Sequence, residues 1–556
     1  MIEAQLADWL GVGLRTAAPD LGLDPDALPA PELTATRQKE HGDFATNVAL
    51  ALAGRAGRPP REVAAAIVAA LPEAPFVDRV EIAGPGFINL FTTEDWLHDV
   101  VRRILAEGPA FGRGASSGER VQVEFVSANP TGPLTIGHAR NAAIGDTLAR
   151  LLAFAGHEVE REYYFNDAGE QMDRFGASVE ARYLQALGRD APVPEDGYHG
   201  DYVRTYAEEI LAAEGPGLAD LPPEERFVRL RSEGARRAMD GMRATLARFG
   251  IAFDTYLREA SLEDEGEIAQ AIERLTAAGA TYESEGALWF RSTVHGDDKD
   301  RVLVRSNGRH TYFAADCAYV IDKFGRGFDH LLYVWGADHH GDVVRVMGAA
   351  TVLGYDVARL ELLLYQFVTF LRGGEPVKMS KRAGTFVTLD ELIDEVGADA
   401  ARFHLLLFSN DHAMNFDIEE VARASMDNPV YYVQYAHARI ASILRAAAEA
   451  GHTPDAGADL ALLTHEAELD LARALAGVPG VIAKAADLRA PHRLTHAAQD
   501  LAARCHRFYT ESRVLGEDES LSRARLALAA AAQRTLAILL GLVGVTAPER
   551  MDRDDG

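Results

Sequence analysis

The sequence is poor in cysteine, in export or membrane segments and in basic residues, and each shortage excludes a class of protein. It holds two cysteines, Cys317 and Cys505, and no CxxC pair, so neither a disulfide framework nor a cysteine-rich zinc site is expected. The N-terminus has no apolar stretch suited to export. The longest apolar run, near Leu526–Val545, is interrupted by Gln533 and Arg534 and predicts a buried helix rather than a membrane span. We therefore expect a cytoplasmic protein with no structural metal.

Acidic residues outnumber basic ones, 84 Asp and Glu against 56 Lys and Arg, which gives a formal net charge of −28. This argues against nucleic-acid binding, because contacts with phosphate need local positive charge. Net charge is a global sum, however, and a basic stripe can lie on an acidic body. The charge therefore weakens an RNA-binding interpretation without excluding it.

Changes of pattern along the chain predict three domains. Residues 1–112 have the pattern of an α+β domain, which ends in a glycine-rich segment. Residues 119–417 are typical of a Rossmann-type parallel sheet, with a helix-rich acidic insertion at about 167–298. Residues 418–556 predict an all-α bundle. The expected fold class is α/β, with an N-terminal α+β domain and a C-terminal helical bundle.

A strand, a tight loop and a helix mark the first candidate site. Val121–Val126 alternates as a strand does, residues 127–133 form a Gly/Pro loop, and helical spacing begins at about Gly137. A helix N-terminus offers backbone N–H groups and a positive dipole end, both suited to phosphate. Gly137 lets a nucleotide approach closely, and His138 can donate to phosphate oxygens. Taken alone, such a histidine more often caps or packs a loop.

A lysine-rich loop is the second candidate. The apolar run Glu361–Leu371 predicts a strand, which leads through a Gly-Gly turn into Val-Lys-Met-Ser-Lys-Arg-Ala-Gly at 377–384. Lys378 and Lys381, followed by Arg382, suit a mobile loop that neutralises a triphosphate. Alone, an exposed lysine-rich loop is the simpler interpretation, but the two motifs in one α/β domain support each other.

Together the motifs resemble the HIGH and KMSKS signatures of class I aminoacyl-tRNA synthetases. Thr135 stands in place of the first His of one signature, and Arg382 in place of the last Ser of the other. Further segments are similar to the arginyl-tRNA synthetase family from end to end of the chain. These segments are 42–47, 84–89, 124–140, 164–171, 311–316, 335–340, 428–439 and 547–551.

The resemblance implies an enzyme that ligates L-arginine to its cognate tRNA with Mg²⁺-ATP. An arginyl-adenylate forms first, and arginine is then transferred to the 2′-hydroxyl of the terminal adenosine. The implied partners are tRNA(Arg), L-arginine and ATP, without a membrane, and we expect a monomer. Catalytic roles fall to His138, Lys378 and Lys381. The implied ATP-binding residues are Thr135, Gly137, His138, Lys378, Met379, Ser380 and Lys381.

The chemistry of candidate side chains suits arginine, because a guanidinium pairs with carboxylates and with aromatic faces. Glu124 and Asp316 supply carboxylates, and Tyr312 shares a face with Asp316 if both lie on one helix. Without the motifs around them, both carboxylates would be interpreted as surface charges. The arginine-binding residues that the resemblance implies are Glu124, Ser127, Asn129, Tyr312, Asp316 and His339.

Contacts with tRNA are implied at both ends of the chain. The N-terminal domain resembles the family's added domain at the tRNA elbow, and the C-terminal helices resemble its anticodon-binding domain. Tyrosines at the start of the bundle can stack on unpaired bases or pack in the core. The candidates are Asn89, Tyr431, Tyr435 and Met551.

Two other functions stay open. A small-molecule nucleotidyltransferase could share the histidine loop, although it would not need the terminal domains. A catalytically inactive RNA-binding relative would fit Thr135 and the acidic charge, whereas the retained Glu124, His138, Asp316 and Lys381 oppose it. Among other synthetases, the branched-chain enzymes would need a longer editing insertion, and the cysteinyl enzyme would need cysteine-rich zinc ligands.

Overall fold

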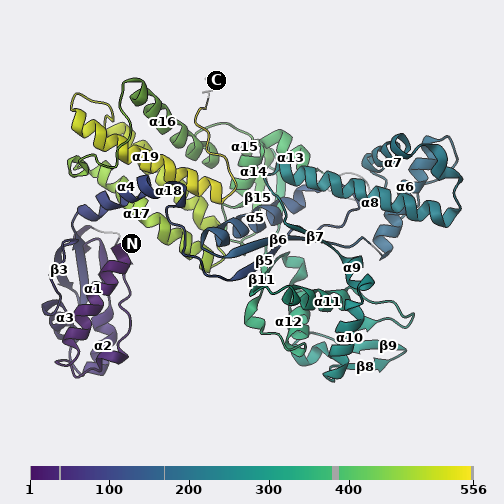
Figure 1. Cartoon of the computed structure of the whole chain (residues 1–556), viewed down its shortest axis with the longest axis horizontal. Coiled ribbons are helices and arrows are strands. Elements are labelled where there is room, and N and C mark those ends of the chain that lie inside the picture. Colours follow the sequence, from purple (N-terminus) through teal and green to yellow (C-terminus); the bar gives the residue numbers. More distant parts are fainter. Residues whose placement is uncertain (1, 37–38, 168, 378–386, 552–556) are drawn as a thin grey trace. The chain divides into compact units, whose positions relative to one another are not determined.

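The computed structural model describes residues 2–36, 39–167, 169–377 and 387–551 (Figure 1). The chain divides into two compact units, and the C-terminal helices contribute to both. The first unit comprises Met1–Phe111, Ile440–Val478 and Ala503–Thr535. The second comprises Gly112–Arg439, Pro479–Ala502 and Leu536–Gly556.

The N-terminal part of the first unit is an α+β structure, as predicted. Four antiparallel strands form a sheet in the order β1-β2-β4-β3. Leu6, Leu10 and Leu14 recur at helical spacing on α1 and are buried. The strands are β1 (Thr34–Ala35), β2 (Phe44–Thr46), β3 (Val77–Ala83) and β4 (Phe87–Thr92). The helices are α1 (Ile2–Ala17), α2 (Val48–Ala56), α3 (Pro60–Ala69) and α4 (Asp95–Glu107).

The C-terminal region is helical, which confirms the predicted helical pattern. It contains α16 (Pro429–Glu449), α17 (Glu466–Asp487), α18 (His492–Glu511) and α19 (Glu519–Leu542). Helix α19 is long and apolar enough to cross a membrane, but 72% of its most apolar window is buried inside the protein. The apolar run therefore forms a buried helix, as its interrupting polar residues predict.

A five-stranded parallel sheet is the centre of the second unit, in the order β12-β11-β5-β6-β7. Strand β5 is buried on both faces, which is the usual state of a parallel strand covered by helices. The strands are β5 (Arg120–Glu124), β6 (Glu158–Phe165), β7 (Thr255–Arg258), β11 (His330–Gly336) and β12 (Leu360–Tyr365). The first helix after β5 is α5 (Ala139–Phe154). The predicted α/β fold class is thereby confirmed.

One predicted strand is wrong. The run Glu361–Leu371 forms two strands, β12 and β13 (Val368–Arg372), which belong to different sheets. Strand β13 pairs with β14 (Glu375–Pro376) and with β15 (Met414–Asp417). The main-chain N–H of Gln366, between the two strands, donates to the carbonyl of Asn410, so the chain leaves the central sheet at this point.

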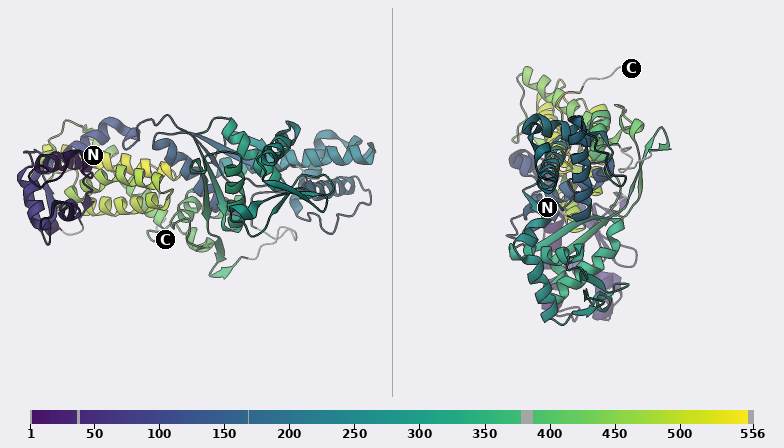
Figure 2. Two further views of the ribbon diagram at one scale, coloured as in Figure 1. Left: turned by 90° about the horizontal axis from the view of Figure 1, so that it is seen from below. Right: turned by 90° about the vertical axis from the view of Figure 1, so that its right-hand side faces the viewer.

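The predicted insertion is rich in helices, and it also contributes β7 to the central sheet. Helices α6 (Gly169–Ala186), α7 (Asp201–Glu214) and α8 (Pro223–Arg248) pack on one another around their own core (Figures 1 and 2). Further along the chain, β8 (Thr281–Ser284), β9 (Ala287–Phe290) and β10 (Arg301–Val304) form a small antiparallel sheet.

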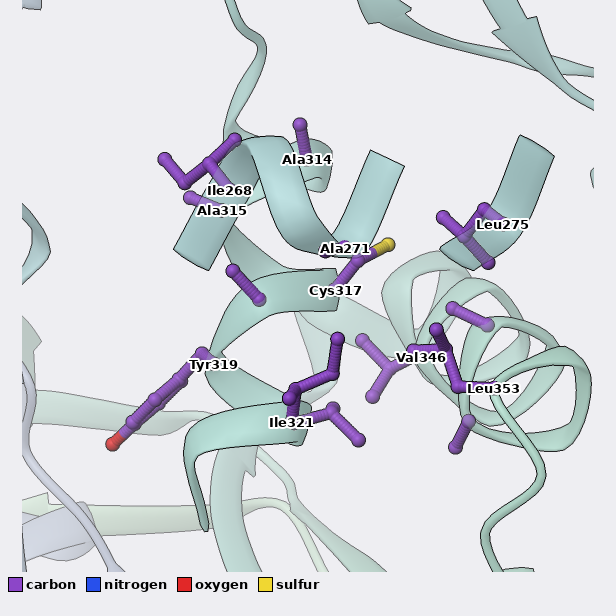
Figure 3. Packing of buried hydrophobic residues seen from close by; sticks show 14 of the residues in the cluster. Ile268, Ala271, Leu275, Ala314, Ala315, Cys317, Tyr319, Ile321, Val346 and Leu353 are labelled. Atoms are coloured by element: carbon purple, nitrogen blue, oxygen red, sulfur yellow. The ribbon is translucent and has the colours of Figure 1, made fainter. Parts of the chain in front are cut away.

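Helix α11 (Tyr312–Gly325) has two different faces. Its apolar face packs with α10 (Glu267–Ala277) and α12 (His340–Val352) in one buried cluster. Figure 3 shows Cys317 and Ile321 near Val346 and Leu353, whereas Tyr319 extends to the other side. The apolar face anchors the helix, and the opposite face carries the polar residues of the site described next.

Candidate active site

A cavity of about 870 Å³ lies at the carboxyl ends of β5 and β11. The strand order reverses between these two strands, and open α/β sheets bind ligands at such a point. Predicted site residues from four segments of the chain line this cavity. They are Glu124, Ser127, Thr135, Gly137, His138, Tyr312, Asp316 and His339.

The loop after β5 is held in an unusual backbone conformation at the cavity. Val126 and Ser127 have φ values of 66° and 45°, in the left-handed region that a β-branched residue such as Val rarely adopts. The side chain of Asn141, on α5, accepts from the Val126 N–H at 2.5 Å and donates to the Val334 carbonyl at 2.8 Å. Asn141 therefore joins the ends of β5 and β11 to α5, and the sequence did not single it out.

Thr135 orients the histidine of the first signature. The main-chain N–H of Thr135 donates to Nδ1 of His138 at 3.1 Å, and the Thr135 hydroxyl oxygen lies 3.1 Å from the same nitrogen. The Thr135 carbonyl oxygen lies 3.3 Å from this nitrogen as well, so three groups of Thr135 contact Nδ1 of His138. The replacement of the first signature histidine by Thr thus leaves a residue that fixes the position of the His138 ring.

The lysine motif itself lies outside the described residues, which include neither Lys378, Met379, Ser380 nor Lys381. The chain that follows the motif is described and contacts the histidine motif. The Ile136 N–H donates to the Val387 carbonyl at 3.1 Å, and the Leu389 N–H donates to the Leu134 carbonyl at 2.9 Å. Residues 387–389, which follow the lysine motif in the sequence, are therefore tied to the start of the histidine motif by main-chain hydrogen bonds.

The two predicted arginine-binding carboxylates differ in their partners. Glu124 is 4% exposed, its Oε2 lies 2.6 Å from Nζ of Lys323, and its Oε1 accepts from the Ser127 hydroxyl at 3.0 Å. Asp316 has no hydrogen bond or ion pair with any residue of the described ranges. Burial, and then the negative charge of Glu259, raise the pKa of Asp316 to about 8.

Glu259 is a second acid in this region that the sequence did not indicate. It begins α9 (Glu259–Asp264), and it accepts from the Tyr164 hydroxyl at 2.7 Å and from the Asn166 amide at 2.8 Å. Burial raises the pKa of Glu259 to about 7. The ring of Tyr164 lines the cavity and stacks on Tyr319 with 4.5 Å between centroids. The cavity thus has an acidic and aromatic wall.

His339 lines the cavity, whereas His340 is not among the residues that line it. Nδ1 of His339 lies 3.0 Å from the carboxylate of Asp342, and this hydrogen bond raises the pKa of His339. The Trp335 ring lies 5.6 Å from the His339 ring. Other lining residues that the sequence did not single out are Asp338, Arg345, Tyr365 and Phe367.

The remaining candidates lie away from the cavity lining. Asn129 accepts from the Asn166 N–H at 3.0 Å and donates to Gln171 at 2.8 Å, so it fixes the loop. The structure describes all four candidates for tRNA contact. Asn89 is buried on β4, Met551 is half-buried, and Tyr431 stacks on Tyr435 with 6.2 Å between centroids. Their roles stay predictions.

Comparison with known proteins agrees with this geometry. Residues 100–442 match the family described as tRNA synthetases class I (R), catalytic domain. The parallel sheet and its cavity at the switch point are therefore those of a class I aminoacyl-tRNA synthetase. Residues 11–92 match the arginyl tRNA synthetase N terminal domain, and residues 433–551 match the DALR anticodon binding domain.

Relatives match this chain over nearly its whole length. An arginine–tRNA ligase of Heliobacterium modesticaldum is 49% identical over 94% of both chains, and one of Moorella thermoacetica is 50% identical over 95% of both. The arginyl-tRNA synthetase structure of Thermus thermophilus superposes with a TM-score of 0.76 and 25% identity, covering 99% of this chain and 100% of that one. The chain belongs to the arginyl-tRNA synthetase family. The predicted family and the ATP-dependent ligation of arginine to tRNA through an adenylate, with transfer to the 2′-hydroxyl, are confirmed.

Proposed function

We propose that the cavity at the ends of β5 and β11 binds arginine and ATP side by side and that arginyl-adenylate forms there. The observation that carries this proposal is Asp316, an acid facing a large cavity without a partner in the described part of the chain. A buried carboxylate is stabilised by an opposite charge. The guanidinium of arginine supplies that charge with a fork of donors.

Arginine enters with its side chain toward α11. Asp316 and Glu124 accept from the guanidinium, and Tyr312, which is 56% exposed at the rim, contacts the side chain from outside. Ser127 and Asn129 stand at the α-amino and carboxylate end, where the strained loop after β5 holds them. The loop conformation is fixed before substrate arrives, which lowers the entropy lost on binding.

ATP binds at the start of α5 as its Mg²⁺ complex. Thr135, Gly137 and His138 contact the phosphates, because the helix N-terminus and the ring N–H of His138 both favour negative charge. The lysine motif, residues 378–381, follows β14 and neutralises the phosphates during the reaction. The adenine lies on the aromatic side of the cavity, near Trp335 and Phe367.

The reaction needs positioning and charge rather than a covalent enzyme intermediate. A carboxylate oxygen of arginine attacks the α-phosphorus in line, and the bond to the leaving oxygen breaks to release pyrophosphate. His138, the α5 N-terminus and Lys381 stabilise the charge that develops on the phosphates. The 2′-hydroxyl of the terminal adenosine then attacks the arginyl carbonyl, and AMP leaves.

The rest of the molecule serves tRNA in this proposal. The N-terminal domain, residues 1–112, contacts the tRNA elbow near Asn89, and the helical domain, residues 418–556, binds the anticodon through Tyr431, Tyr435 and Met551. The catalytic domain, residues 119–417, receives the acceptor end. The enzyme acts as a monomer in the cytoplasm, away from membranes.

Pyrophosphate exchange with each amino acid, with and without bulk tRNA, tests the function. We expect exchange with arginine, strongly increased by tRNA, and none above background with the other amino acids. Exchange that prefers another amino acid would contradict the proposal.

A matched pair of histidine variants tests the site. His138→Asn should lower kcat of exchange by about a hundredfold, because a charge-stabilising donor is lost. His340→Asn, which alters a histidine outside the cavity lining, should leave kcat within about twofold. Equal effects of the two variants would contradict the assignment of His138.

A further inference from the structure

Helix α11 carries one polar stripe that runs beyond the cavity. Tyr312, Asp316, Tyr319, Lys323 and Arg326 follow each other at steps of three or four residues, so they share a face of the helix. The first three line the cavity. Lys323 and Arg326 lie beyond it and face the central sheet.

Two glutamates of that sheet receive the two cations. Glu124 on β5 and Glu162 on β6 stand directly opposite each other in the register, a like-charge arrangement that destabilises a sheet unless each carboxylate is compensated. Nζ of Lys323 lies 2.6 Å from Glu124 and 3.9 Å from Glu162. Arg326 binds Glu162 with both terminal nitrogens, at 2.5 and 3.1 Å. Each glutamate therefore has its own cation.

Lys323 is buried between two aromatic rings. It is 1% exposed, and its ammonium lies 3.6 Å from the Tyr333 ring centroid and 4.1 Å from that of Tyr319. Burial lowers the pKa of Lys323, and the neighbouring Glu124 opposes this effect. A buried pair of this kind often gives no more stability than apolar residues of the same size. Stability alone therefore does not explain it.

The two ion pairs differ in one respect. Glu124 lines the cavity, whereas neither Glu162 nor Arg326 does. A carboxylate accepts about four hydrogen bonds, and Lys323 and Ser127 occupy one position on each oxygen of Glu124. The two contacts hold Glu124 in place, and its remaining acceptor positions are available to a ligand.

We propose that Lys323 is a positioning residue for arginine binding, because its ammonium fixes the orientation in which Glu124 accepts the substrate guanidinium. This inference rests on the proposed role of Glu124. Lys323 does not touch the substrate. It acts through the carboxylate, because Glu124 lines the cavity and Lys323 does not.

The test compares Lys323→Met with Arg326→Met in aminoacylation of tRNA(Arg). Lys323→Met should raise the KM for arginine about tenfold or more, because a charge-assisted hydrogen bond to substrate is weakened, and leave the KM for ATP within about twofold. Arg326→Met breaks the matched ion pair outside the cavity, so it should lower Tm yet leave the arginine KM within about twofold. An unchanged arginine KM in Lys323→Met, or an equal rise in Arg326→Met, would overturn the proposal.

Two further variants test the role of Glu124 and the role of Lys323 separately. Glu124→Gln should itself raise the arginine KM; if it does not, the proposed role of Glu124 is wrong. If Glu124→Gln raises it and Lys323→Met does not, only the role of Lys323 is wrong. The double variant Glu124→Gln/Lys323→Met removes both charges, so it folds even if Lys323→Met does not. Its arginine KM should equal that of Glu124→Gln, and a further rise of about tenfold would contradict the proposal.

Discussion

The two ends of α11 make opposite use of charge. At the end that faces the sheet, Lys323 and Arg326 are each paired with a glutamate at hydrogen-bonding distance. At the end that faces the cavity, the Asp316 side chain has no hydrogen bond or ion pair among the described residues, and His339 lowers its pKa only through charge. The charges at the first end are therefore neutralised by residues of the protein itself. At the second end, the guanidinium of arginine can supply the positive charge that pairs with Asp316. The same helix therefore holds paired charges at one end and a binding site at the other.

The largest effect on activity is expected from a change at Asp316. Asp316→Asn should lower kcat/KM for arginine by at least about a hundredfold, since a desolvated partner of the substrate charge is lost. Asp322→Asn is the matched control: Asp322 lies on the same helix, outside the cavity lining, and contacts Arg326 at 2.8 Å. The control should stay within about threefold of the parent in the same pyrophosphate exchange assay. Similar losses in both variants would show that α11 is merely sensitive to change.

The pH dependence of arginine binding should follow the ionisation of Asp316. Asp316 has a pKa of about 8 in the free protein, so it is mostly protonated below that pH and must ionise to bind a guanidinium. The KM for arginine should therefore fall about tenfold for each unit of rising pH up to about 8 and then level off. Asp316→Asn should flatten this profile. A wild-type KM that is constant from pH 6.5 to 9 would contradict the assignment.

Two tyrosines of the stripe, Tyr312 and Tyr319, offer a smaller contrast. Tyr312→Phe should raise the arginine KM by roughly threefold, because its hydroxyl lies at the rim of the site. Tyr319 hydrogen-bonds to Glu162, so Tyr319→Phe should lower Tm and leave the arginine KM nearly unchanged. Steady-state kinetics and thermal unfolding of both variants check the two effects. A change in the arginine KM that occurs only in Tyr319→Phe would contradict the roles proposed for the two tyrosines.

The smallest expected effect is on stability. The pKa of Asp316 is raised in the folded protein, so its ionisation opposes folding increasingly as pH rises from about 4 to 8. Asp316→Asn should therefore raise Tm by roughly 2 °C at pH 8.5, and the difference should vanish toward pH 4. Thermal scans at both pH values check this sign. A lower Tm for the variant at pH 8.5 would mean that Asp316 stabilises the fold.

Much of the fold and part of the site could be predicted from the sequence. The strand-loop-helix pattern around His138 and the α/β pattern were sufficient for the parallel sheet, because those signals are local. Glu124 and Asp316 were found through the motifs around them. The split of Glu361–Leu371 was missed, because apolar periodicity does not show where a chain leaves one sheet for another.

The supporting residues were missed for a physical reason. Lys323 and Glu124 lie 199 residues apart in the sequence, and only the approach of α11 to β5 brings them together. In the sequence, Lys323 resembles any exposed lysine near a helix C-terminus. Asn141 likewise resembles an ordinary polar residue of α5 until the ends of β5 and β11 meet it. Such residues depend on tertiary contacts, which no local pattern encodes.

Proton release on arginine binding tests the central claim most directly. Isothermal titration calorimetry at pH 7, in two buffers with different enthalpies of ionisation, counts the protons exchanged for each arginine bound. If Asp316 is the unpaired acid that the guanidinium completes, about one proton should be released by the parent protein and almost none by Asp316→Asn. Arginine binding without proton release in the parent would contradict the account.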